Sequence, residues 1–175
     1  QDPNSLSSNQ ITCVAVDGKH NIWAGTQNGL NLFDKETRSF RQIYADPGNS
    51  KKLSNNNITT LTVDPEGNLW IGTKGGGLNR LAYNKGEPVF HRITVDSKPI
   101  NISNNFVLSL ITSPDGDLWI GTENGGLNRI NPATRTIEIF KTEEGNDASI
   151  SSNSIWSLYF DNENRLWIGT YNSGI

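Results

Sequence analysis

One hexapeptide recurs along the whole chain. Asn68–Thr73 reads NLWIGT, and the same pattern returns as DLWIGT at Asp117–Thr122 and RLWIGT at Arg165–Thr170, with a weaker copy, NIWAGT, at Asn21–Thr26. The tryptophans of the four copies are 47, 49 and 48 residues apart. Seventeen residues before each tryptophan, an aliphatic residue opens a polar turn: Leu6, Leu53, Ile102 and Ile150. A fixed period of this length indicates a repeat architecture in which each unit is one small structural module.

Each unit reads as four short strands. The first is a run such as Ile58–Val63, and a turn with Pro, Glu and Gly (Asp64–Asn68) leads to the LWIGT strand. A Gly-rich turn, a third strand beginning LN and an aromatic fourth strand follow. No 3.6-residue apolar pattern indicates helices. We therefore predict an all-β fold, a fragment of a β-propeller with about three and a half four-stranded antiparallel blades. The predicted units are residues 6–52, 53–101, 102–149 and 150–175, the last of them incomplete.

Alternation in the first strand predicts how the blades pack. One face carries the bulkier residues: Val14 and Val16, Leu61 and Val63, Leu108 and Leu110, then Trp156, Leu158 and Phe160. The other carries smaller ones: Ile11, Cys13 and Ala15, then Ile58, Thr60 and Thr62, then Val107, Ser109 and Ile111, then Ile155, Ser157 and Tyr159. Two apolar faces suit a sheet that lies between two neighbours. We expect the repeated tryptophans to be scaffold residues of this packing: Trp23, Trp70, Trp119 and Trp167.

Composition excludes several functions. The net charge is −3 with no basic run, which argues against binding to nucleic acid or to an anionic membrane. The lone Cys13 excludes an internal disulfide framework, and no apolar stretch approaches the ~20 residues of a membrane span. Because the chain lacks Met, we interpret it as a processed or excised piece. Three and a half blades do not close a ring, so we expect the open edges to self-associate.

The repeat resembles that of a known family. Leu53–Leu81 (LSNNNITTLTVDPEGNLWIGTKGGGLNRL) and Ile102–Ile130 (ISNNFVLSLITSPDGDLWIGTENGGLNRI) are similar to two-component regulator propeller repeats, and the similarity extends over essentially the whole chain. The resemblance implies the periplasmic sensor region of a hybrid two-component system of Bacteroidetes. It also implies a seven-bladed ring and an oligosaccharide ligand. No kinase His or nucleotide-binding motif is found, so the resemblance implies a fragment of a sensor that is not itself an enzyme.

Positions that vary between units are candidate ligand contacts. The start of each first strand and the residue after each GT lie at one edge of an antiparallel blade, and we call this set the rim. It contains Gln10, Asn57, Phe106 and Ser154, together with Gln27, Lys74, Glu123 and Tyr171. Variable polar and aromatic residues on a rigid frame suit recognition of sugars. Trp156, two residues into its strand, and Tyr171 are the candidates for stacking on a sugar ring, although alternation favours core packing for Trp156.

Other motifs favour structural interpretations. Asn9, Asn56, Asn105 and Asn153 are expected to close turns, and the KGGG segment is expected to be a turn with positive φ angles rather than a phosphate loop. The carboxylates of DPEGN, SPDGD and DNENR lack EF-hand spacing, which favours solvated hairpin turns over a metal site. His20 and His91 fall in different elements, so no catalytic pair is expected. Cys13 is expected to be a buried, inert thiol.

Two functions remain after these exclusions. The first is an extracytoplasmic sensor propeller that binds an oligosaccharide without catalysis, needs no cofactor or metal and does not itself contact the membrane. The alternative is a structural or protein-interaction propeller, with this stretch serving as a scaffold or dimer surface. A propeller lyase is the third and weakest hypothesis, because it would need a His and a carboxylate converging on the central channel.

Overall fold

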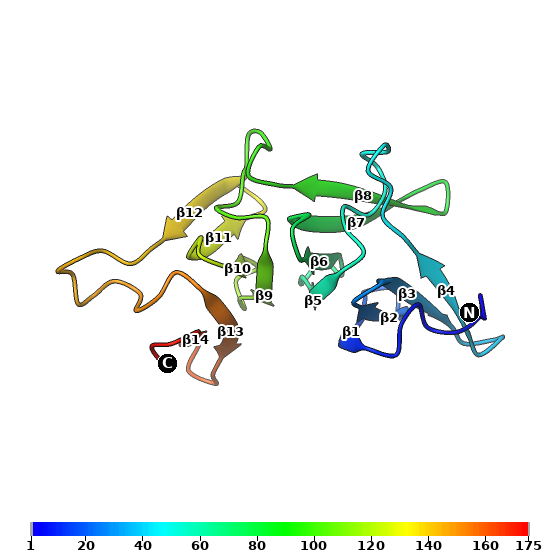
Figure 1. The fold of residues 1–175 in the computed structure, drawn as a ribbon, viewed down its shortest axis with the longest axis horizontal. Helices are drawn as coiled ribbons and strands as arrows, with labels where there is room; N and C mark the ends of the chain where they lie inside the picture. Colours follow the sequence, from blue (N-terminus) through cyan, green and yellow to red (C-terminus); the bar gives the residue numbers. More distant parts are fainter. Residues whose placement is uncertain (1, 175) are drawn as a thin grey trace.

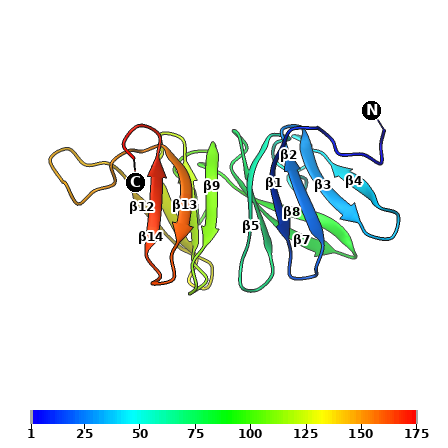
Figure 2. The same ribbon diagram turned by 90° about the horizontal axis from the view of Figure 1, so that it is seen from below.

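The chain folds into an arc of antiparallel sheets around an open centre. A computed structural model of the chain describes residues 2–174, and these contain strands and turns but no α-helix. Three sheets have four strands and the last has two (Figure 1). The first strand of each sheet lies on the inside of the arc and the fourth on the outside, and the two ends of the chain lie at opposite ends of the arc (Figures 1 and 2). This arrangement is a fragment of a β-propeller, as the repeat predicts.

The blades follow the chain order without crossovers. Blade 1 consists of β1 (Ile11–Val16), β2 (Ile22–Thr26), β3 (Gly29–Asp34) and β4 (Ser39–Ile43). Blade 2 consists of β5 (Ile58–Val63), β6 (Leu69–Thr73), β7 (Leu78–Asn84) and β8 (Glu87–Ile93). Blade 3 consists of β9 (Val107–Thr112), β10 (Leu118–Thr122), β11 (Leu127–Asn131) and β12 (Thr136–Phe140). Blade 4 consists of β13 (Ile155–Phe160) and β14 (Leu166–Thr170).

The hydrophobic core lies between successive blades. One cluster joins Trp23 of blade 1 to Leu61 and Val63 of blade 2, and a second joins Trp70 of blade 2 to Leu110 of blade 3. Each tryptophan therefore faces the following blade, while the bulky face of each first strand points to the preceding one. With no blade before it, the bulky face of β1 is open, and Val14 and Val16 are 61% and 54% exposed.

The glycine of each WIGT or WAGT strand lets neighbouring blades approach closely. A Cβ atom on Gly25 would lie 2.6 Å from Cγ2 of Ile58, and one on Gly72 would lie 2.7 Å from Cγ1 of Val107. Real Cβ atoms do not tolerate such distances, so any side chain here would push two blades apart. The repeated glycine is thus explained by packing between blades rather than by a turn.

A bulge near the start of each first strand corrects the expected faces. In blade 1, Ile11 pairs with Thr26 and Cys13 pairs with Gly25, so Thr12 is left over, and the same shift occurs in every blade. One extra residue reverses the alternation on its N-terminal side. The expectation for the first residue of the strand is therefore wrong, because Ile58 and Val107 join the bulky face and are fully buried.

A buried polar network ties each blade to the segment before its first strand. Asn79 of β7 is fully buried; its Oδ1 accepts the Ser54 N–H at 3.1 Å, and its Nδ2 donates to Ser54 Oγ at 2.7 Å. Ser54 Oγ also lies 3.5 Å from Oγ1 of the buried Thr73, which in turn donates to the Gly77 carbonyl at 2.8 Å. The equivalent residues of blades 1 and 3 are Ser7, Asn31 and Thr26, and Ser103, Asn128 and Thr122.

The asparagines that were expected to close local turns instead close the longer loops between blades. Oδ1 of Asn56 accepts the Ala45 N–H at 2.7 Å, and Asn105 and Asn153 make the same bond to Val95 and Thr142. Each of these asparagines thus joins the two ends of the loop between two blades. The local turn is closed by the preceding residue, since Asn55 Oδ1 accepts the Asn57 N–H at 2.8 Å.

Candidate functional site

The rim forms in every blade as a pair of backbone segments. The N–H after each GT donates to the carbonyl of the residue before the first strand. These bonds join Gln27 to Gln10 (3.3 Å), Lys74 to Asn57 (2.9 Å), Glu123 to Phe106 (3.0 Å) and Tyr171 to Ser154 (3.1 Å). A β-bridge between Lys74 and Phe106 further connects the rims of blades 2 and 3. The variable residues therefore lie on one continuous edge, held in place by backbone hydrogen bonds that do not depend on their side chains.

Trp156 and Tyr171 form an aromatic pair on this edge. Their ring centroids are 5.7 Å apart with an interplanar angle of 23°, and the two residues are 55% and 63% exposed. Alternation predicted that Trp156 faces blade 3, and this face is wrong because Trp156 occupies the bulge position of β13. The bulge turns its side chain away from blade 3, toward the side on which Thr12 and Thr59 of blades 1 and 2 bond the next blade's backbone.

The other predicted contacts differ in their exposure. Gln27 and Lys74 are exposed, Glu123 is half-buried, and Phe106 is 39% exposed. Gln27 and Lys74 stay exposed although a following blade is present next to each. The same position in blade 4 is Tyr171, so its exposure is a property of the rim and not only of the open end of the arc.

The opposite edge of the blades carries a second set of repeated contacts. The first aspartate of the turn between the first two strands accepts a hydrogen bond from the indole N–H of the repeated tryptophan. The distances to Nε1 are 2.9 Å for Asp17 and Trp23, 2.9 Å for Asp64 and Trp70, and 2.8 Å for Asp161 and Trp167. Asp17 and Asp64 are buried, and so is Asp117 of the third turn. The expectation of a solvated turn is therefore wrong for Asp64 and Asp117. They stabilise the scaffold.

Hydrogen bonds hold two of these carboxylates in the ionised form. Burial alone would raise the pKa of Asp17, but hydrogen bonds from Asn21, Trp23 and Lys19 lower this pKa below its usual value. The bond from Trp167, with further bonds from Arg165 and Glu163, lowers the pKa of Asp161 to about 2. Both pKa values are lowered because the turn and the tryptophan donate hydrogen bonds to the ionised carboxylate.

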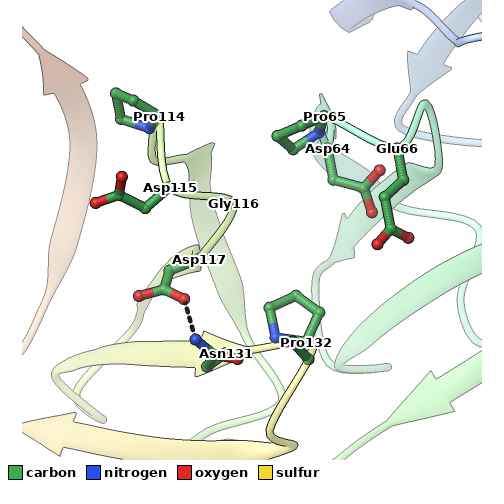
Figure 3. A pocket seen from close by; sticks show the side chains of 10 residues that line it. Asp64, Pro65, Glu66, Pro114, Asp115, Gly116, Asp117, Asn131 and Pro132 are labelled. Atoms are coloured by element: carbon green, nitrogen blue, oxygen red, sulfur yellow. Dashed lines mark hydrogen bonds between the residues drawn. The ribbon is translucent and has the colours of Figure 1, made fainter.

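Blade 3 departs from this pattern. Ser113 replaces the first aspartate, and an acid, Asp117, stands where the other turns have Asn or Arg. Asp117 is buried, forms an ion pair with Arg129 and accepts a bond from Asn131 at 2.8 Å (Figure 3). The ion pair raises the pKa of the Arg129 guanidinium. The hollow in Figure 3 lies between the turns of blades 2 and 3, has a volume of about 220 Å³ and contains no rim residue.

No catalytic arrangement is built around the histidines. His20 lies in the turn after β1 and His91 lies in β8, one blade further on. The half-buried Cys13 has its thiol pKa raised by burial. Within residues 2–174, no group of three or more His, Cys, Asp or Glu side chains is placed to hold a metal ion. The same residues contain no apolar helix of the length needed to cross a membrane.

Sequence reasoning missed two functional groups of the scaffold. The Ser–Asn–Thr network was present in the sequence as repeated offsets, since an aliphatic residue followed by Ser, then GLN and GT, recur in all three complete units. The Asp–Trp bond was present as an Asp six residues before Trp in three of the four units. The rim residues were found because they break the repeat. Residues that keep the repeat indicated a fold, but the partners within the Ser–Asn–Thr network lie 19 to 25 positions apart and could not be assigned from spacing alone.

The arc of four-stranded blades, with its tryptophan-centred interfaces, defines a β-propeller protein. The sequence model of the family described as two component regulator propeller matches residues 5–28, 52–75, 101–124 and 149–172, together more than half of the chain. The chain therefore belongs to the two component regulator propeller family. A comparison with curated proteins found no match.

Solved structures agree with this assignment. The chain is similar to the extracellular domain of the hybrid two component system BT3049 of B. thetaiotaomicron, with 25% identity and a TM-score of 0.73 over 94% of this chain and 21% of that domain. The extracellular domain of BT4673 from the same organism has 21% identity and a TM-score of 0.54, over 99% of this chain and 28% of that one. The chain thus spans about a fifth to a quarter of these domains.

The fold is shared with an enzyme as well. Virginiamycin B lyase of Staphylococcus aureus is 18% identical, with a TM-score of 0.64 over 94% of this chain and 50% of the lyase. At this identity the similarity concerns the fold alone, because propellers of one architecture support unrelated functions.

Proposed function

We propose that this chain is part of an extracytoplasmic sensor that binds an oligosaccharide at the rim and does not catalyse a reaction. Family membership and similarity to extracellular domains of hybrid two component systems support the sensor class and its location. The observation that supports an oligosaccharide as the ligand is the exposed Trp156–Tyr171 pair. Sugar rings pack their C–H faces on flat aromatic surfaces, and nearby polar groups bond their hydroxyls.

The rim supplies the polar groups that such a ligand needs. Lys74 and Gln27 are exposed donors, and Glu123 is an acceptor. Phe106, which is 39% exposed and paired with Lys74, adds a second aromatic surface. All of these side chains project from backbone segments that the blades fix in position. Binding would therefore require little ordering of the protein, which lowers its entropic cost.

Non-catalytic binding is favoured over the lyase hypothesis by the position of the histidines. His20 and His91 are not rim residues, and they lie in different blades. A general base must come within hydrogen-bond reach of the proton that it removes. Neither histidine meets this condition for a ligand stacked on Trp156.

The test is calorimetric titration of the protein with purified oligosaccharides of galactan, arabinan, xylan and mannan. We expect Trp156→Ala and Tyr171→Ala each to weaken binding about tenfold, equivalent to about 1.4 kcal/mol. Tyr159→Ala is the matched control, because Tyr159 lies in the same strand β13 and is 61% exposed but is not a rim residue. Equal losses in Tyr159→Ala and Trp156→Ala would contradict the assignment of the rim as the binding surface.

A further inference from the structure

A hollow between blades 2 and 3 has a strongly positive lining. Its volume is about 420 Å³, and it lies between β8, the loop that precedes Ile102 and the turn after β11. Its basic lining residues are Arg80, His91, Arg92, Lys98 and Arg135, and Trp70 contributes an aromatic wall. None of the described residues that line it is acidic. The chain as a whole carries a net charge of −3, so this concentration of cations is local.

Arg80, one of these lining residues, has no acidic partner for its charge within residues 2–174. Its guanidinium lies over the Trp70 ring, 5.8 Å from the centroid, and its Nε atom is buried with no hydrogen-bond partner among residues 2–174. A buried donor left unpaired costs free energy, and a charged one costs more. Such an atom in a folded protein indicates a partner that comes from outside the chain.

Arg129, the equivalent arginine of blade 3, shows which partners an arginine at this position of the sheet binds. Arg129 pairs across the sheet with Trp119 and Glu138, as Arg80 does with Trp70 and His91. Arg129 forms ion pairs with both Asp117 and Glu138. Blade 3 therefore supplies two carboxylates to its arginine.

Blade 2 supplies no carboxylate to Arg80. His91 stands in the place of Glu138, and Asn68 stands in the place of Asp117. Asp64, an acid of the turn between β5 and β6, accepts hydrogen bonds from Asn68 and Trp70 instead. Arg80 thus keeps the geometry of Arg129 but lacks the anions that blade 3 provides.

The other cationic side chains of the hollow differ in whether they already form hydrogen bonds or ion pairs. Arg92 is held by backbone carbonyls of the loop between blades 1 and 2, at 2.8 to 3.1 Å. Lys98 and Arg135 are exposed, and within residues 2–174 neither forms an ion pair. Arg80, Lys98 and Arg135 therefore remain free to share one anionic group.

We propose that this hollow binds an oxyanion, a carboxylate or a sulfate, with Arg80 as its principal ligand. The planar guanidinium fork matches the geometry of two oxygens of such a group. The carboxylates that pair with Arg129 in blade 3, and that blade 2 lacks, belong to the same chemical class. The group is carried by an acidic saccharide or is a free inorganic anion. The hollow contains no rim residue, so this proposal is independent of the proposed function.

The experiment titrates the protein with three probes at constant ionic strength: trigalacturonate, its neutral counterpart galactotriose, and inorganic sulfate. We expect one or both anions to bind, and Arg80→Leu to weaken that binding at least about tenfold. Leucine suits the test because Leu32 occupies the equivalent position of blade 1. Lys98→Gln, at an exposed site, is a second variant and should weaken binding severalfold without disturbing the fold.

Lys35→Gln is the matched control, because it removes an exposed cation of blade 1 and should leave anion binding unchanged. Preference for trigalacturonate over sulfate would identify an acidic saccharide, and the reverse would identify a free anion. The proposal is overturned if neither anion binds, or if anion affinity is unchanged in Arg80→Leu. Trp156→Ala should not affect anion binding in the hollow. This result would distinguish a failure of the proposed oligosaccharide site at the rim from a failure of the proposed anion site.

Discussion

Replacing Asn79 with Leu should destabilise the protein strongly although the two side chains have the same number and branching of non-hydrogen atoms. Asn79 is fully buried and makes two hydrogen bonds to Ser54, at 3.1 Å to its N–H and 2.7 Å to its Oγ. Leucine makes neither bond and leaves the part-buried Ser54 N–H without its acceptor. A typical hydrogen bond contributes about 1 kcal/mol, and an unsatisfied buried donor costs about 1–3 kcal/mol. The free energy of unfolding should therefore fall by about 2–4 kcal/mol.

The assay is urea unfolding followed by tryptophan fluorescence, with thermal unfolding as a second measure. A loss of this size corresponds to a decrease in Tm of about 5–15 °C for a domain of this length. Asn84→Leu is the matched control, since Asn84 is exposed in the same strand β7 and its replacement should change stability by less than about 0.5 kcal/mol. If Asn79→Leu were as stable as Asn84→Leu, the network would not be a source of stability and the reasoning would be refuted.

Two further predictions concern charge and assembly. Because the pKa of Asp161 is lowered to about 2 in the folded chain, its contribution to stability should be complete above about pH 4 and lost as the pH falls through 2. An NMR titration of the carboxylate and of the Trp167 indole N–H tests this, and a midpoint near 3.8 would contradict it. The exposed apolar faces formed by Val14 and Val16 at one end, and by Trp167 at the other, should make the chain self-associate. Light scattering during gel filtration should then give about twice 19.3 kDa, and a stable monomer would argue against this prediction.

The repeat by itself determined the architecture. Strands, turns and their order follow from local chemistry: alternating apolar residues, Pro and Asp in the turns, and Gly where φ is positive, as at Gly75 and Gly77. Equal spacing of Trp23, Trp70, Trp119 and Trp167 required equivalent blades, and therefore a propeller. The rim was also predictable, because the ends of antiparallel strands meet at one edge whatever the side chains are.

Tertiary structure decided the roles of individual side chains. The bulge that turns Trp156 away from blade 3 depends on pairing between β13 and β14, whereas alternation alone placed that residue on the face toward blade 3. The unpaired state of Arg80 became visible only when its sheet position was matched to that of Arg129, whose carboxylates come from another strand and another turn. The physical reason is the same in both cases. A repeat specifies what each blade shares, whereas exposure and charge pairing depend on contacts between residues distant in sequence, and these contacts exist only after the blades have packed.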